Sequence, residues 1–187
     1  MTNPALVRSL QAVTNPGVKK GAVGLIVALI ALLAPSIAAA ARSAPETQLR
    51  AGGHSQLGGV VWEEWTYPDG PYCVASSGDG AGTFPRSLHL GDGIQHARFV
   101  LLRRQKPAEV TITAWHRVDS HGHETGPSEE LPYTLVPRRD GDGILTAWRV
   151  RFSVDPPPRY YLHLYVRWPN GKCGGPRHVL RTYSLGP

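Results

Sequence analysis

The stretch Asp119-Ser-His121-Gly-His123-Glu124 concentrates potential metal ligands within six positions of this 187-residue chain. Imidazole and carboxylate groups suit zinc, copper or nickel. A metal site, however, needs three or four ligands held in fixed geometry, and a loop that contains glycine does not supply that geometry by itself. His121 and His123 are therefore candidates for a metal site, whereas a polar exposed turn is the favoured interpretation.

Two carboxylate patterns invite enzymatic or calcium-binding interpretations. Glu63 and Glu64 lie between two tryptophans, but adjacent strand residues point to opposite faces, so they cannot flank one sugar bond as glycosidase carboxylates do. Asp140-Gly-Asp142-Gly lacks the further oxygen ligands of a calcium loop, so a tight turn is favoured.

Motifs of the common catalytic sites are also absent from the sequence. It contains no nucleophile elbow, no H-E-x-x-H and no phosphate loop. We therefore expect a protein that is not an enzyme and that uses no cofactor. The alternative is a small secreted hydrolase or metal-dependent enzyme that uses the loop of His121 and His123.

The segment 160–168 alternates apolar and polar residues with a period of two, which is typical of a strand with one buried face. If Leu162 and Leu164 point inward, four polar or aromatic side chains point outward. Tyrosine and arginine are frequent in binding hot spots. This face is therefore a candidate ligand-binding platform for an envelope glycan or a protein. It consists of Tyr161, His163, Tyr165 and Arg167.

Two other interpretations of this face remain open. The aromatic residues could simply stabilise the sheet through cross-strand pairs. A second layer built from residues 42–107 could also cover them, in which case the protein would be purely structural.

Similar alternation recurs along the chain, separated by turn signals such as Asp69-Gly70 and Asn170-Gly171. No segment shows a helical stripe. The sequence therefore predicts an all-β fold, an antiparallel sandwich of the immunoglobulin-like kind with about eight strands and no substantial helix after the leader. We also expect a hairpin with Asn170-Gly171 at its tip. The expected strands lie at 60–67, 87–90, 97–103, 110–115, 131–136, 144–154, 160–168 and 178–185.

Cys73 and Cys173 are the two cysteines of the chain. Neither has the surroundings that would make it reactive. We therefore expect a disulfide between them, as is common in exported domains.

Residues 108–187 resemble a fibronectin type III or related immunoglobulin-like domain. The segment 110–115 resembles an early strand that ends in the core tryptophan, here Trp115. The segment 154–164 resembles the approach to a tyrosine corner formed by Tyr160. The resemblance implies a sandwich and, by analogy, a binding or spacer role.

The N-terminal residues 1–41 have the three parts of a signal peptide, namely Arg8, Lys19 and Lys20, a short apolar run, and small residues before Arg42. We expect cleavage after Ala40 or Ala41, with an uncleaved membrane anchor as the alternative. The rest would be secreted or held outside the cytoplasm. Residues 42–59 are poor in large apolar side chains and predict a flexible spacer, followed by a single β-sandwich domain over 60–187.

The exported part has a small positive charge. Without the three leader cations, 17 Lys and Arg remain of 20, against 14 acids, a net charge of +3. No segment has the density of basic residues that nucleic-acid binding needs, so we expect no nucleic-acid partner. Contact with a membrane is expected only through an uncleaved leader.

Overall fold

The fold of the computed structural model, which describes residues 43–90, 95–155 and 159–186, consists of strands in two large sheets and one short ribbon. The smaller of the large sheets has five antiparallel strands. Their order in the sheet differs from their order along the chain, and they come from both halves of the domain. In spatial order they are β11 (Thr134–Arg139), β12 (Leu145–Val154), β6 (Gln95–Leu101), β1 (Thr47–Ala51) and β2 (His54–Leu57).

The second sheet has seven strands, of which six form an antiparallel path. That path is β10 (Glu129–Glu130), β7 (Glu109–Trp115), β13 (Tyr160–Arg167), β14 (Arg177–Gly186), β3 (Gly59–Asp69) and β4 (Tyr72–Asp79). The seventh strand, β5 (Leu88–His89), pairs in parallel with β14. The ribbon joins β8 (Arg117–Val118) to β9 (Glu124–Thr125).

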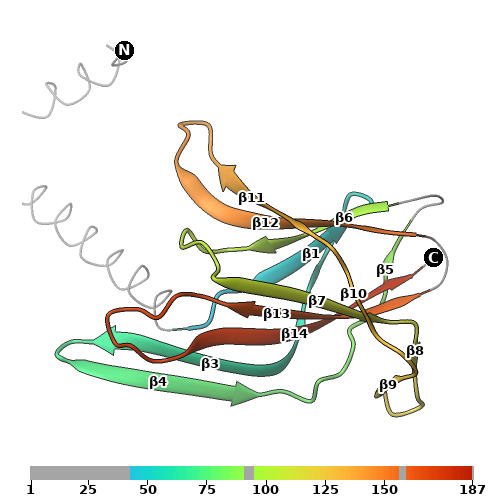
Figure 1. The fold of residues 1–187 in the computed structure, drawn as a ribbon, viewed down its shortest axis with the longest axis horizontal. Helices are drawn as coiled ribbons and strands as arrows, with labels where there is room; N and C mark the ends of the chain where they lie inside the picture. Colours follow the sequence, from blue (N-terminus) through green and yellow to red (C-terminus); the bar gives the residue numbers. More distant parts are fainter. Residues whose placement is uncertain (1–42, 91–94, 156–158, 187) are drawn as a thin grey trace, which may run out of the picture. The chain divides into compact units, whose positions relative to one another are not determined.

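The two large sheets pack face to face and enclose the core (Figure 1). Leu49 of β1, Phe99 of β6 and Leu162 of β13 are fully buried there. The alternation predicted for the segment 160–168 is confirmed, because its even-numbered residues are buried and its odd-numbered residues are not. An all-β antiparallel sandwich is therefore confirmed as the fold class.

All eight expected strands are present, and the described residues form six further ones. The flexible spacer expected over 42–59 is wrong for residues 47–57, which form β1 and β2. These strands contain few large apolar residues because only one face of β1 is buried, and Leu49 fills it. The described residues belong to one compact unit that begins before residue 60. The expected leader, 1–41, lies outside the described residues.

Two local expectations are corrected. The connection between β13 and β14 is longer than a two-residue hairpin, and its tight turn runs from Gly171 to Gly174, where the amide of Gly174 donates to the carbonyl of Gly171 (2.9 Å). The residue with positive φ is Gly174, not Gly171. Trp115 is not the core tryptophan, because it faces outward on β7; Trp65 and Trp168 are fully buried instead.

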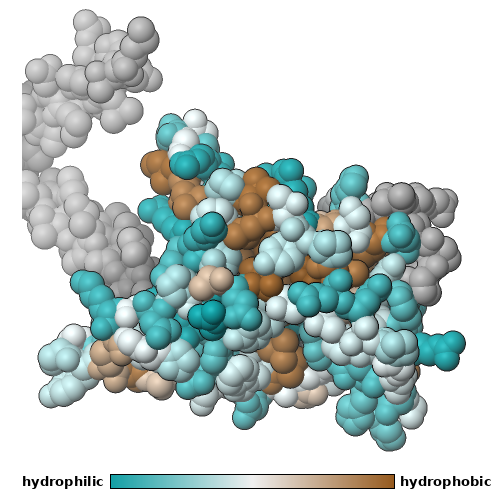
Figure 2. Space-filling model, viewed as in Figure 1, coloured by the Kyte–Doolittle hydropathy of each residue, from teal (hydrophilic) through white to brown (hydrophobic). Residues whose placement is uncertain are grey.

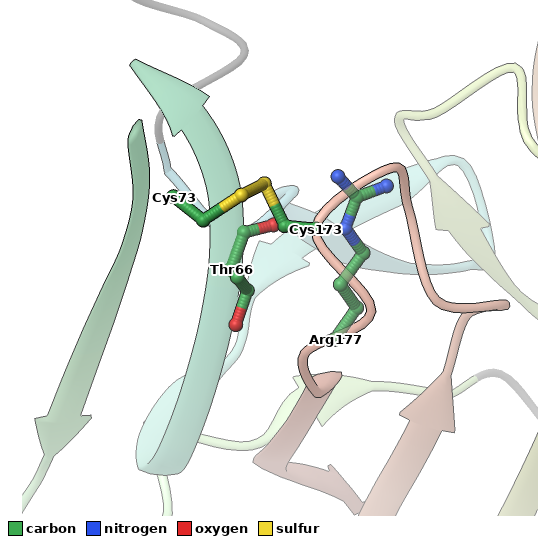
Figure 3. Close-up of a disulfide and its surroundings, with 4 residues drawn as sticks. All are labelled: Thr66, Cys73, Cys173 and Arg177. Carbon is green, nitrogen blue, oxygen red and sulfur yellow. Dashed lines mark hydrogen bonds between the residues drawn. A yellow bond between two sulfur atoms is a disulfide. The ribbon is translucent and has the colours of Figure 1, made fainter. Parts of the chain in front are cut away.

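The expected disulfide between Cys73 and Cys173 is present, with a Cα–Cα distance of 5.6 Å. Figure 3 shows that it joins β4 to the connection before β14, and that Thr66 of β3 lies beside it. The guanidinium Nε of Arg177 donates to the carbonyl of Thr66 (2.9 Å), and the amide of Thr66 donates to the carbonyl of Pro176 (3.0 Å). The bridge and these bonds together fix one end of β3.

Apolar side chains gather along β11 and β12 on the face drawn in Figure 2, and smaller apolar groups stand among hydrophilic ones in the region of β3 and β4. Ile144, at the end of the β11–β12 hairpin, is among the exposed large apolar residues. The part of the chain that the structure describes has no helix of the length and apolarity that crossing a membrane requires.

Candidate functional site

The four residues predicted to form a platform on β13 do share the outer face of the seven-stranded sheet. The strands β7 and β14 flank β13, so each of these residues has a neighbour on both sides. Tyr161, His163 and Tyr165 are half-buried and Arg167 is exposed. Phe84, from outside the sheet, contacts Tyr161 and His163, so we call the surroundings of Tyr161 the capped part of this face and those of Tyr165 the open part.

Aromatic rings from three neighbouring strands meet in the open part. We call Trp62 of β3, His178 of β14 and Tyr165 of β13 the aromatic strip. The rings of Trp62 and His178 lie 4.2 Å apart, and those of His178 and Tyr165 lie 6.2 Å apart. Leu180 lies between Trp62 and Tyr165 in the strand register, so the strip has an apolar floor. Partial burial raises the pKa of the Tyr165 hydroxyl, with a further contribution from the charge of Glu109.

A row of paired charges borders the aromatic strip. Glu64 Oε2 lies 3.3 Å from His178 Nε2, and Arg167 Nε donates to Glu109 Oε2 at 2.8 Å. Arg167 therefore does not present a free positive charge, because a cross-strand carboxylate already pairs with it. The row offers hydrogen-bonding groups with little net charge.

The part around Tyr161 is capped by two segments from elsewhere in the chain. Phe84 packs edge-on against Tyr161, with ring centroids 5.0 Å apart, and stacks on His163 at 5.7 Å. Trp115 contacts the other side of His163 at 4.7 Å. Glu124 Oε1 of β9 lies 2.5 Å from His163 Nε2, so a carboxylate faces the imidazole directly. The layer from residues 42–107 that the sequence analysis considered thus covers only part of this face.

A groove of about 590 Å³ opens beside the capped part. Phe84 and Tyr161 supply its aromatic wall, and Arg86 and Arg159 supply two positive charges. Aromatic and cationic groups thus converge in this hollow of the sheet face.

His163 loses most of its contact with water in this arrangement; its side chain is 20% exposed. Burial lowers the pKa of His163, and the carboxylate of Glu124 opposes that effect without reversing it. The unfolded chain therefore binds a proton at His163 more readily than the folded chain does. The contribution of neutral His163 to the free energy of unfolding is fully present above about pH 6.5, which is the pKa of histidine in the unfolded chain. This contribution is lost as the pH falls below that value.

We therefore expect the melting temperature to fall on acidification from about pH 7.5 to about pH 5.5, and His163→Gln to reduce this fall. Calorimetry at several pH values measures the effect. His54→Gln, at an exposed histidine of β2, is the matched control. An acid sensitivity that is the same in His163→Gln as in the unchanged protein would contradict the assignment.

The loop of His121 and His123 is a turn whose carboxylates are engaged. Asp119 Oδ1 accepts hydrogen bonds from the amides of His121 (2.8 Å) and His123 (2.9 Å), and these bonds are the main reason that the pKa of Asp119 is lowered. Glu124 faces His163 instead. Within residues 43–90, 95–155 and 159–186, no group of three potential ligands comes together as a metal site.

The other two carboxylate patterns also belong to local structure. Asp140 Oδ1 accepts from the amides of Asp142 (3.1 Å) and Ile144 (2.9 Å), which closes the β11–β12 turn. Glu63 and Glu64 point to opposite faces, and they pair with Arg181 and His178 respectively. These groups act as turn and strand partners.

Trp62, His178 and Phe84 are the site residues that sequence reasoning did not find. Trp62 and His178 lie on strands that were expected, but their position next to Tyr165 depends on strand order, which alternation does not encode. Phe84 lies in a connection without a strand pattern. The outward position of Trp62 in its strand was the one available signal.

Comparison with known proteins identifies no relative: no family model, no curated protein and no solved structure matches this chain.

One bond has the geometry of a tyrosine corner, since Tyr160 Oη donates to the backbone carbonyl of Asp155 at 3.0 Å. The outward position of Trp115 does not follow the fibronectin type III pattern.

Proposed function

We propose that this protein is an exported, non-catalytic binding domain that holds an envelope glycan on the outer face of its seven-stranded sheet. The observation that carries the proposal is the aromatic strip, in which Trp62, His178 and Tyr165 lie side by side on a rigid sheet. Rigid aromatic anchors lose little entropy on binding, so such a strip is an effective contact surface.

The chemistry of the face suits a sugar chain. A sugar ring presents an apolar C–H surface that can lie on Trp62 and Tyr165, and its hydroxyl groups project from the ring edge. The bordering pairs, Glu64 with His178 and Glu109 with Arg167, supply donors and acceptors for those hydroxyls. The groove beside Tyr161 gives room for a further unit of the chain.

Export is supported by two observations. The leader pattern over 1–41 is that of a signal peptide. The disulfide between Cys73 and Cys173 fits an oxidising compartment, because such bonds are rare where glutathione keeps thiols reduced.

The test is the double substitution Trp62→Ala with Tyr165→Ala. We expect the purified chain to be retained on isolated, insoluble envelope glycan and the double variant to lose at least about tenfold in affinity, because two stacking contacts are removed. Tyr72→Ala is the matched control, since Tyr72 is 73% exposed on β4 and lies outside the strip. Circular dichroism checks that each variant is folded.

Two results would overturn the proposal. One is the absence of binding to any glycan, in which case a protein partner takes the place of the glycan. The other is a double variant that binds as well as the Tyr72→Ala control, which would make the strip an ordinary set of cross-strand pairs.

A further inference from the structure

Charge is strongly segregated between the two large sheets. The strands of the five-stranded sheet contain six arginines and no Asp or Glu. The strands of the seven-stranded sheet contain seven Asp or Glu and three arginines. The charged residues of the strands are thus sorted into one basic and one mainly acidic sheet.

Five of the six arginines share the outer face of the five-stranded sheet. Arg50, Arg98 and Arg151 stand directly opposite one another on β1, β6 and β12. Arg149 lies two positions from Arg151 on the same face, and Arg138 lies on the neighbouring β11. We call Arg50, Arg98, Arg138, Arg149 and Arg151 the arginine face.

Folding alone does not favour this arrangement. Like charges directly opposite each other on neighbouring strands destabilise a sheet. No carboxylate of the described residues forms an ion pair with any member of the arginine face. Partial burial and then the charges of the other four members lower the pKa of the Arg149 guanidinium, so the five charges act on one another. Bound anions would relieve this repulsion.

Two grooves on this face form one elongated path. One of about 480 Å³ lies between β6, β12 and β11, and one of about 230 Å³ lies between β6, β1 and β2. They share His96 and Arg98, so they meet at the centre of the sheet. Ser153 and Thr134 border the first groove and Ser55 borders the second, and their hydroxyl groups can bond to a sugar.

We propose that the arginine face is a second binding site, for an acidic polysaccharide whose carboxylate groups pair with the guanidinium groups. Neighbouring strands place Arg50, Arg98 and Arg151 about 5 Å apart in the hydrogen-bonding direction. A linear polymer with one carboxylate on each sugar matches a row of closely spaced cations, and each guanidinium can bind a carboxylate through two hydrogen bonds. The site lies on the opposite sheet from the aromatic strip and goes beyond the function proposed above.

The surroundings favour a polysaccharide over other polyanions. Single-stranded nucleic acid is held through stacking of its bases on aromatic side chains. Among the described residues, no tryptophan, tyrosine or phenylalanine lines either groove from the outer face; Phe152 is a core residue. The major groove of duplex DNA admits a helix or a two-stranded ribbon, whereas the arginine face belongs to a sheet of five strands.

The experiment measures binding of the purified full chain to polygalacturonate, with methyl-esterified polygalacturonate as the uncharged ligand. We expect binding of the acid form only, and weaker binding as salt concentration rises. Arg98→Gln with Arg151→Gln should weaken binding by about tenfold, since two charge-assisted contacts are lost. The matched control is Arg104→Gln with Arg117→Gln, which removes the same charge at two exposed arginines outside the face.

Each alternative has its own result. Equal loss in the control variant would show a non-specific effect of net charge, and single-stranded DNA that binds as tightly as polygalacturonate would remove the assignment to a polysaccharide. Concentration-dependent self-association that disappears in Arg98→Gln/Arg151→Gln would assign the face to a second copy of the chain. If that variant does not fold, equal binding of the acid and esterified polymers by the unchanged protein would still overturn the proposal.

The two proposals fail separately. Trp62→Ala with Tyr165→Ala should leave binding of polygalacturonate unchanged, because these residues lie on the other sheet. Loss of the arginine-face site would likewise leave retention on insoluble glycan intact.

Discussion

Replacing Cys173 with serine is expected to lower the free energy of unfolding by about 2–5 kcal/mol. The bond to Cys73 closes a loop of 100 residues, and opening it increases the freedom of the unfolded chain. It also releases the connection before β14 from β4, so that only backbone and Arg177 hydrogen bonds still fix this end of β3. Urea denaturation of the variant and of the unchanged protein measures the loss.

A mutant cycle separates the loss of the bond from the effects of the substitutions. Cys73→Ser should cost about as much as Cys173→Ser, and the double variant should cost little more, because each change removes the same bond. The double variant also has no free thiol, which excludes incorrect pairing as the cause. Additive losses would mean that the two cysteines stabilise the fold independently, against the prediction.

The strands that could be predicted are those in which burial imposes a strict period of two. In 160–168, the residues Leu162, Leu164 and Val166 are fully buried and the intervening residues are not. The alternation therefore predicts both the strand and its buried face. β1 and β2 escape prediction because the second is an edge strand without a buried residue. Its residues, His-Ser-Gln-Leu, form a strand because they pair with β1. Such pairing does not require alternating apolar and polar residues, so the sequence pattern does not reveal it.

Of the candidate site, only the residues on the single strand β13 could be predicted from the sequence. Alternation placed Tyr161 and Tyr165 on one outward face, and the structure agrees. Which strands flank β13 depends on chain connections that bring β7 and β14 beside it and place β3 on the far side of β14. The contacts of Phe84 and Glu124 with His163 join residues 79 and 39 positions apart, respectively, and such contacts have no signature in local sequence.

The arginine face illustrates the same limit for charge. Its members lie at positions 50, 98, 138, 149 and 151, so no window of the sequence appears strongly basic. Net charge and the local density of basic residues do not reveal this face, because they contain no information on which strands become neighbours. Segregation of charge appears only when the strands are ordered into two sheets, with the acids of β3, β7 and β10 on the opposite side of the sandwich.

Trp65→Ala is expected to lower the free energy of unfolding by about 3–5 kcal/mol. Trp65 is 0% exposed and packs edge-on against Trp168, with ring centroids 5.5 Å apart. The guanidinium carbons of Arg103 and Arg177 lie 4.6 and 5.3 Å from its ring centroid. Burial and the charge of Arg177 lower the pKa of Arg103, so the ring offsets part of the repulsion between two cations.

Two further variants test which of these contributions dominates. Trp65→Phe keeps an aromatic ring and should lose clearly less stability than Trp65→Ala. Trp115→Ala removes a half-buried tryptophan from the outer face of β7. It should lower the free energy of unfolding less than Trp65→Ala does, because folding buries less apolar surface at Trp115 than at Trp65. Urea denaturation with unchanged slopes would show that the native states remain comparable. Equal losses for Trp65→Ala and Trp115→Ala would contradict the placement of Trp65 in the core, and with it the support that β3 gives to Trp62.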